Sequence, residues 1–213
     1  MQRVVAEVRR RFEGEGSGHD WFHIERVWKM AKRIGAEENA DVFIVELAAL
    51  LHDIADWKFH HDDDSVGPRE ARTILEQHGV DVATTDRVCA IIDRVTYKDA
   101  QVATTQETIE GNIVQDADRL DALGAIGIAR AFAYGGKIGW PFYDPANMPE
   151  QHATKEAYAA GRLTGTTINH FYEKLLLLKD RMNTVTGKKI AGKRHAFLEE
   201  YLKRFYQEWE GKM

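Results

Sequence analysis

Apolar positions recur at helical spacing along most of the 213-residue chain. Between Asp20 and Ile34 they fall three and four residues apart, which predicts a helix with one buried face. Residues 42–55 are apolar on nearly every side, as is typical of a central helix enclosed by its neighbours. Because no alternating strand pattern competes with these signals, the sequence predicts an all-α fold, organised as a helical bundle.

Further helices are predicted from periodicity and from residues that begin or end helices. They cover residues 68–78, 85–95, 113–134, 167–182 and 191–209. Gly187 and Gly192 are expected to break the chain between the last two. Residues 135–165 hold three of the four prolines and are predicted to be irregular, and so long a stretch is usually functional or mobile.

Length and composition indicate one globular domain over residues 1–213. Its motif-bearing core is expected at about 18–130, an irregular loop at about 135–165 and C-terminal helices at about 166–211. Hydrophobic residues make up 44% and charged residues 30%, which excludes disordered and low-complexity chains. The net charge of −5 argues against nucleic-acid partners, since no overall positive field exists to attract phosphate backbones.

Location is inferred from the N-terminus and from Cys89, the single cysteine. The first fifteen residues are too charged for a signal peptide, and no apolar run approaches the roughly 18 residues of a membrane span. Cys89 lies in an apolar run, where a buried, reduced thiol is expected. We therefore expect a cytoplasmic protein without membrane partners.

Three places combine titratable side chains with apolar surroundings. His23 precedes Val27 by four residues, so a helix brings it to the edge of the apolar face. His52 and Asp53 end the apolar run ELAALLHD, where burial of both is costly without a partner. Asp118 shares an apolar helix face further along the chain. Taken singly, each fits a structural role: a satisfied core histidine, a hydrogen-bonded helix end, or one acid among several.

The acids around Asp118 leave an ambiguity. Asp116 and Asp121 lie about 200° and 300° around the same helix, so we expect them to face solvent or to support the ligands. The local pattern does not fully separate Asp118 from Asp121. Together, two imidazoles and two carboxylates on three helices supply four of the six positions of an octahedral transition metal. Two positions remain for water and a phosphoryl oxygen, which is the arrangement that metal-assisted hydrolysis needs.

The order of one His, a later His-Asp pair and a distant Asp resembles the HD-domain metal-dependent phosphohydrolases. The matching segments are HIERVWKMAKRIG, LAALLHDIADW and IVQDADRLDALGAIG, which together reach from about residue 18 to 130. The stretch FAYGGKIGWPFYDP is similar to small stand-alone bacterial members that include nucleotide pyrophosphohydrolases. The resemblance implies an HD-domain helical bundle in which His23, His52, Asp53 and Asp118 are the metal ligands.

The same resemblance implies one divalent metal ion, with Mn2+ expected first and Mg2+, Co2+, Ni2+, Fe2+ or Zn2+ as alternatives. It also implies an enzyme that hydrolyses (deoxy)nucleoside triphosphates to monophosphate and pyrophosphate. Its partner is a small-molecule phosphate ester or nucleotide. The residues beyond about 163 carry no motif of the family, and helical packing or homodimerisation is their expected role.

Asp56, Lys58 and His61, which follow the His-Asp pair, are candidate catalytic residues. Asp56 follows Asp53 by three residues, so on a continuing helix it could reach a nucleophilic water as general base or orienting group. The alternative is that Asp56 caps the helix or pairs with Lys58. Lys58 and His61 rank first among the cations that could face a triphosphate. The other basic candidates are Arg26, His60, Arg119 and Lys137.

Several alternatives remain open at this level. The same site could serve a nucleotide phosphomonoesterase of 5'-nucleotidase type, or a metal- or ligand-sensing domain without turnover. A diiron oxygenase would need further ligands, and His60 and His61 are an incomplete set for a second metal. Trp140 and Tyr143 could stack on a base, although pinning the loop to the bundle is the usual role for such rings.

Overall fold

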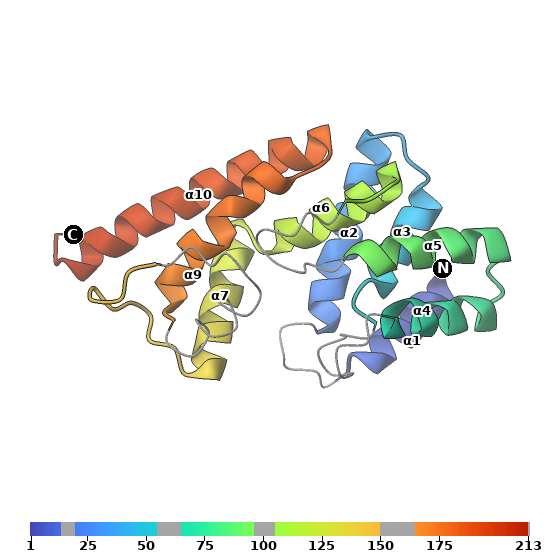
Figure 1. The fold of residues 1–213 in the computed structure, drawn as a ribbon, viewed down its shortest axis with the longest axis horizontal. Helices are drawn as coiled ribbons and strands as arrows, with labels where there is room; N and C mark the ends of the chain where they lie inside the picture. Colours follow the sequence, from blue (N-terminus) through green and yellow to red (C-terminus); the bar gives the residue numbers. More distant parts are fainter. Residues whose placement is uncertain (14–19, 55–64, 96–104, 150–164, 213) are drawn as a thin grey trace. The chain divides into compact units, whose positions relative to one another are not determined.

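The computed structural model describes residues 1–13, 20–54, 65–95, 105–149 and 165–212. Every regular element in these ranges is a helix, so the predicted all-α class is confirmed (Figure 1). The chain divides into two compact units, one of residues 1–98 and 103–118 and the other of residues 99–102 and 119–213. Each unit is therefore described by itself.

The N-terminal unit is arranged around a buried central helix. Helices α2 and α3 pack together, α1 and α5 also contact α3, and α4 packs on α5. Residues 47–51 of α3 are all fully buried, as the apolar run predicts, because neighbours enclose this helix on several sides. The elements are α1 (Gln2–Arg11), α2 (Trp21–Glu37), α3 (Val42–Leu51), α4 (Val66–Gln77), α5 (Val82–Val95) and α6 (Ile109–Asp121), whose last three residues belong to the second unit.

The C-terminal unit is built on a long final helix. Its elements are α7 (Gly124–Ile138), α9 (Thr167–Glu173), the 3-10 helix η2 (Leu175–Arg181) and α10 (Val185–Trp209). Phe171 is fully buried, and its ring stacks on Tyr201 of α10 at 5.8 Å between centroids. Tyr143, which follows α7, meets Phe205 and Trp209 edge-on. These ring contacts hold the segment after α7 against α10, which was the favoured role for Tyr143.

Glycine explains two of the departures from the predicted helices. The helix expected over 113–134 is two helices, because Gly124, the first residue of α7, adopts a left-handed φ of 71°. Gly187 and Gly192 do not break the chain, since both lie within α10. One interior glycine costs a helix only about 1 kcal/mol, which the packing of a long helix offsets.

Other elements also differ from expectation: the helix predicted over 167–182 is a short α-helix, α9, followed by the 3-10 helix η2. The apolar run 42–55 forms a helix only as far as Leu51, and a turn follows it. The N-terminal segment is helix α1, which the sequence did not predict, because only Val4 and Val8 are buried among many charges. Cys89 is buried as predicted. Among the described residues, no helix combines the length and the apolarity that a membrane span requires.

Candidate metal centre

His23 is positioned by the first turn of α2. Asp20 caps this helix as predicted, and its carboxylate accepts a hydrogen bond from the main-chain N–H of His23 at 2.9 Å. The capped turn directs the imidazole inward, where only 1% of the residue is exposed. The helix entry thus holds a titratable ring inside the N-terminal unit.

His52 follows the last residue of α3, and its ring is oriented by the helix that precedes it. Its Nδ1 lies 2.8 Å from the carbonyl oxygen of Ala49. Since a carbonyl only accepts hydrogen bonds, Nδ1 carries the proton and Nε2 presents a lone pair. Nε2 is buried and has no hydrogen-bond partner within the described part of the chain. A buried nitrogen lone pair prepared in this way is suited to bind a cation.

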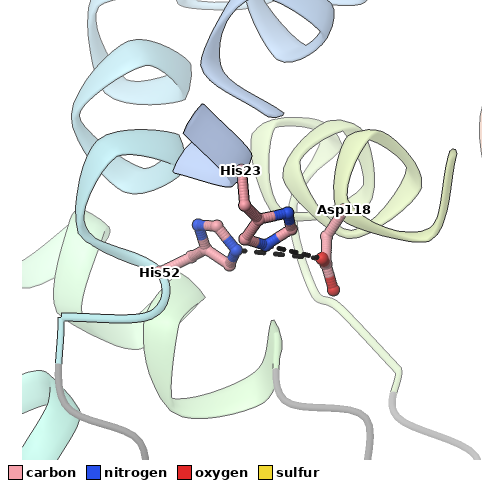
Figure 2. Close-up of side chains that lie close together, drawn as sticks. All are labelled: His23, His52 and Asp118. Carbon is pink, nitrogen blue, oxygen red and sulfur yellow. Dashed lines mark ion pairs between the residues drawn. The ribbon is translucent and has the colours of Figure 1, made fainter. Parts of the chain in front are cut away.

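Two carboxylates from different segments of the chain lie close to the imidazoles. Asp53 Oδ2 lies 3.4 Å from His23 Nε2 and 3.5 Å from His52 Nε2. Asp118 Oδ1, on α6, lies 3.5 Å from His23 Nε2 and 3.8 Å from His52 Nε2. The acid side chains are 23% and 28% exposed, whereas both imidazoles are buried. Figure 2 shows His23, His52 and Asp118 converging on one point.

The spacing of these atoms fits a shared cation. Distances of 3.4–3.8 Å exceed the roughly 2.7–3.2 Å of a good hydrogen bond. Neighbouring donors at right angles around an ion with bonds of about 2.1 Å are about 3.0 Å apart, so a small contraction would bring these donors to bonding distance of one ion. The donor atoms of His23, His52 and Asp118 all lie within 4.8 Å of one another. Imidazole and carboxylate together suit divalent transition metals.

The structure separates the three aspartates of α6. Asp118 faces the imidazoles, while Asp121 accepts a hydrogen bond from Arg130 Nη1 at 2.9 Å within the C-terminal unit. Asp116 and Asp121 are both buried, so of the two roles expected for them the solvent-facing one is wrong. Periodicity places both acids away from the face of Asp118, but it does not indicate whether that side of α6 is covered.

The structure does not test the candidate residues that follow the His-Asp pair. Asp56, Lys58, His60 and His61 lie outside the described residues. The continuing helix that would place Asp56 near Asp53 is not formed, because α3 ends at Leu51.

The remaining candidate cations and aromatic residues are described. Arg26 is half-buried on α2, and Lys137 is exposed near the end of α7. Arg119 donates to the main-chain carbonyl of Arg181 in the C-terminal unit. The ring of Trp140 contacts Tyr134 and His170, as expected of a residue that fixes a loop.

Sequence reasoning missed one contributor, the carbonyl of Ala49. It orients the ring of His52 from one turn earlier in the chain. A carbonyl in the last turn of a helix has no main-chain partner ahead of it, so a histidine three residues later can supply one. That relation could have been found from the position of His52 at the end of the apolar run.

Comparisons with known proteins extend over nearly the whole chain. The HD domain family matches residues 21–123. The uncharacterized protein YpgQ of Bacillus subtilis (strain 168) is 41% identical over 198 residues, which cover 92% of this chain and 87% of that protein. The crystal structure of an HD-superfamily hydrolase from Bacillus thuringiensis is 40% identical, with a TM-score of 0.77, and covers 98% of this chain and 96% of that one.

A further solved structure is that of Bacillus subtilis YpgQ in complex with ADP. It is 36% identical to this chain, with a TM-score of 0.72. The alignment covers 96% of this chain and 97% of that chain. The likeness therefore includes the helices after the motif-bearing region as well as that region itself.

Proposed function

Because the chain belongs to the HD superfamily of metal-dependent phosphohydrolases, we propose that it hydrolyses (deoxy)nucleoside triphosphates to nucleoside monophosphate and pyrophosphate. The convergence of His23, His52 and Asp118 carries this proposal, since it provides a place for the cation that such hydrolysis requires. The ADP bound to YpgQ supports a nucleotide as substrate, because ADP contains a phosphoanhydride bond.

The proposed ligands of one divalent ion are His23, His52, Asp53 and Asp118. When bound, such a cation supplies Lewis-acid chemistry, withdrawing electron density from phosphoryl oxygens and making water more acidic. We propose Mn2+ as the ion, since a mixed set of nitrogen and oxygen donors accommodates it. A panel of metals added to metal-free protein tests this choice.

The side chains of the centre are arranged asymmetrically. The two imidazoles are buried and fixed by their helices, whereas the two acids are partly exposed. Substrate would therefore approach from the carboxylate side. Preorganised donors lower the reorganisation needed when charge develops on the phosphoryl group.

The proposed reaction is attack of water on the α-phosphorus. An oxygen–phosphorus bond forms, the bond from the α-phosphorus to the bridging oxygen breaks, and pyrophosphate leaves with that oxygen. We propose that Asp56 accepts the proton of the water and that Lys58 and His61 pair with the phosphate charges. These three roles rest on their place in the sequence directly after the ligand pair.

The test is a panel of nucleotides incubated with metal-loaded protein, with pyrophosphate and inorganic phosphate measured separately. Pyrophosphate released in equal amount to nucleoside monophosphate is expected. Inorganic phosphate from nucleoside monophosphates would instead indicate a phosphomonoesterase. An inactive but metal-loaded protein would contradict the proposal and favour a ligand-sensing role.

A further inference from the structure

A buried acid joins the beginning of α6 to the beginning of α3. Glu110 is in the first turn of α6, and its side chain is only 8% exposed. Its Oε1 accepts a hydrogen bond of 3.2 Å from the main-chain N–H of Asp41, the N-cap residue of α3. A carboxylate buried in this way costs free energy unless its oxygens are paired, so the contact is specific.

Arg87 of α5 completes this junction. Its guanidinium lies 3.6 Å from Glu110 Oε2 and 3.5 Å from Asp41 Oδ2. Asp41 in turn caps α3 by accepting hydrogen bonds from the N–H groups of Phe43 and Ile44. One carboxylate on α6 thus connects the starts of α6 and α3 with the second turn of α5 in the N-terminal unit.

The two helices that Glu110 joins both end at the metal centre. His52 directly follows α3, Asp118 lies in the last turn of α6, and their nearest donor atoms are 3.8 Å apart. Asp118 is eight residues after Glu110, about 12 Å along a helix that rises about 1.5 Å per residue. Over that length a helix is stiff, so a shift at its beginning moves Asp118 relative to the imidazoles.

We propose that Glu110 is a positioning residue for the metal centre, setting α6 against α3 so that Asp118 meets His23 and His52. The inference rests on the proposed metal site but concerns no residue of that site. The metal ligands hold one end of the helix pair and Glu110 holds the other. Loss of Glu110 should therefore weaken metal binding as well as stability.

The experiment is calorimetric titration of metal-free protein with Mn2+, without nucleotide, for wild type and variants. Glu110→Ala is expected to weaken Mn2+ affinity about tenfold, the size typical for residues that orient metal ligands. Glu110→Gln keeps an oxygen that can accept from Asp41 N–H, so it should restore affinity to within about threefold of wild type. That rescue distinguishes positioning from a loss of charge alone.

The matched control is Asp86→Ala. Asp86 of α5 forms a 2.6 Å ion pair with Arg72 of α4, which joins two helices that carry no metal ligand. Mn2+ affinity should be unchanged in this variant. Thermal midpoints are recorded for each protein, and titrations are run well below the lowest midpoint.

The outcomes distinguish a positioning role of Glu110 from a role in stability alone. A lower midpoint with wild-type Mn2+ affinity in Glu110→Ala would overturn the proposal, as would an equal loss of affinity in Asp86→Ala. If Glu110→Ala does not fold, Arg87→Ala removes the half-exposed partner instead, and unchanged Mn2+ affinity in Arg87→Ala would overturn the proposal. A wild-type protein that binds no Mn2+ would refute the metal site itself, and nucleotide hydrolysis without pyrophosphate release would refute only the substrate.

Discussion

Both units of the protein bury histidines, yet the surroundings of those histidines differ. In the N-terminal unit, the Nε2 atoms of His23 and His52 lie 3.4–3.8 Å from the carboxylates of Asp53 and Asp118, and Asp118 is distant in sequence from both histidines. In the C-terminal unit, His195 Nε2 lies 3.4 Å from Glu199, which is exposed and one turn along the same helix. His170 lies beside the ring of Trp140.

The difference shows that burial of a titratable residue does not by itself indicate a site. His195 lies beside an acid one turn along its own helix, and aromatic packing holds that helix, so local structure accounts for this contact. His23, His52 and Asp118 come from three separate segments, and no local rule brings them together. Convergence of donor atoms from distant segments is what distinguishes a candidate metal centre from ordinary buried polar groups.

The largest difference between the two units is expected when one buried histidine is replaced in each. His52→Ala should abolish Mn2+ retention and hydrolysis together, with an affinity loss above the roughly 100-fold upper range for residues that only support ligands. His195→Ala should leave both unchanged. Metal content after dialysis, helical content and nucleotide turnover are measured for the two variants, and metal retained by His52→Ala would refute its assignment as a ligand.

The variant Asp56→Asn separates binding of the cation from catalysis of hydrolysis. If Asp56 takes the proton of the attacking water, kcat should fall about 100-fold or more while Mn2+ affinity stays within about twofold. Asparagine retains the size of the side chain but is not a base. A single-turnover assay of pyrophosphate release measures the effect, and an unchanged rate would assign Asp56 a structural role.

In the C-terminal unit, a change in packing should alter stability without altering the metal centre. A Cβ at Gly135 would lie 2.2 Å from Thr167 Oγ1, so Gly135→Ala should lower the free energy of unfolding by about 1–3 kcal/mol. Gly136→Ala is the matched control, because nothing lies within 4 Å of its added Cβ. Urea unfolding and Mn2+ titration are compared for both variants. A loss of Mn2+ affinity in Gly135→Ala would show that packing in the C-terminal unit affects the metal centre and would contradict this prediction.

The smallest effect is expected at Cys89, a buried titratable group without converging partners. Its Sγ donates to the carbonyl of Pro68 at 3.3 Å, and burial raises the pKa of the thiol. Because the folded pKa lies above the unfolded value, the stabilisation is complete below about pH 8.5 and is lost as pH rises through the folded pKa. Cys89→Ala removes a buried side-chain atom, so its free energy of unfolding should differ from that of wild type by a constant amount at neutral pH. That difference should change only in the alkaline range, and a difference that stays constant there would contradict the shift.

Sequence periodicity anticipated the parts of the fold that local signals control. The start of α2 followed from Asp20 as N-cap, and the burial of α3 followed from its continuous apolar run. The break at Gly124 could not be foreseen, because a glycine inside an apolar pattern is compatible with either a helix or a left-handed turn. For the same reason, Gly187 and Gly192 were expected to break a helix, whereas both lie within α10.

Part of the candidate site could likewise be predicted from the sequence, and part could not. His23, the His52-Asp53 pair and Asp118 could be selected from their apolar settings and from the resemblance, but their proximity depends on packing between distant helices. Glu110 had no local signal, since an acid in the first turn of a helix is ordinary. Its part is visible only where α6 meets the start of α3.

The most direct measurement is an anomalous difference map from crystals grown with Mn2+ and collected at its absorption edge. A metal-dependent phosphohydrolase built on this centre should give one strong peak at coordinate-bond distance from His23 Nε2, His52 Nε2 and a carboxylate oxygen of Asp118. No peak among these three side chains, or a strong peak only elsewhere, would contradict the assignment.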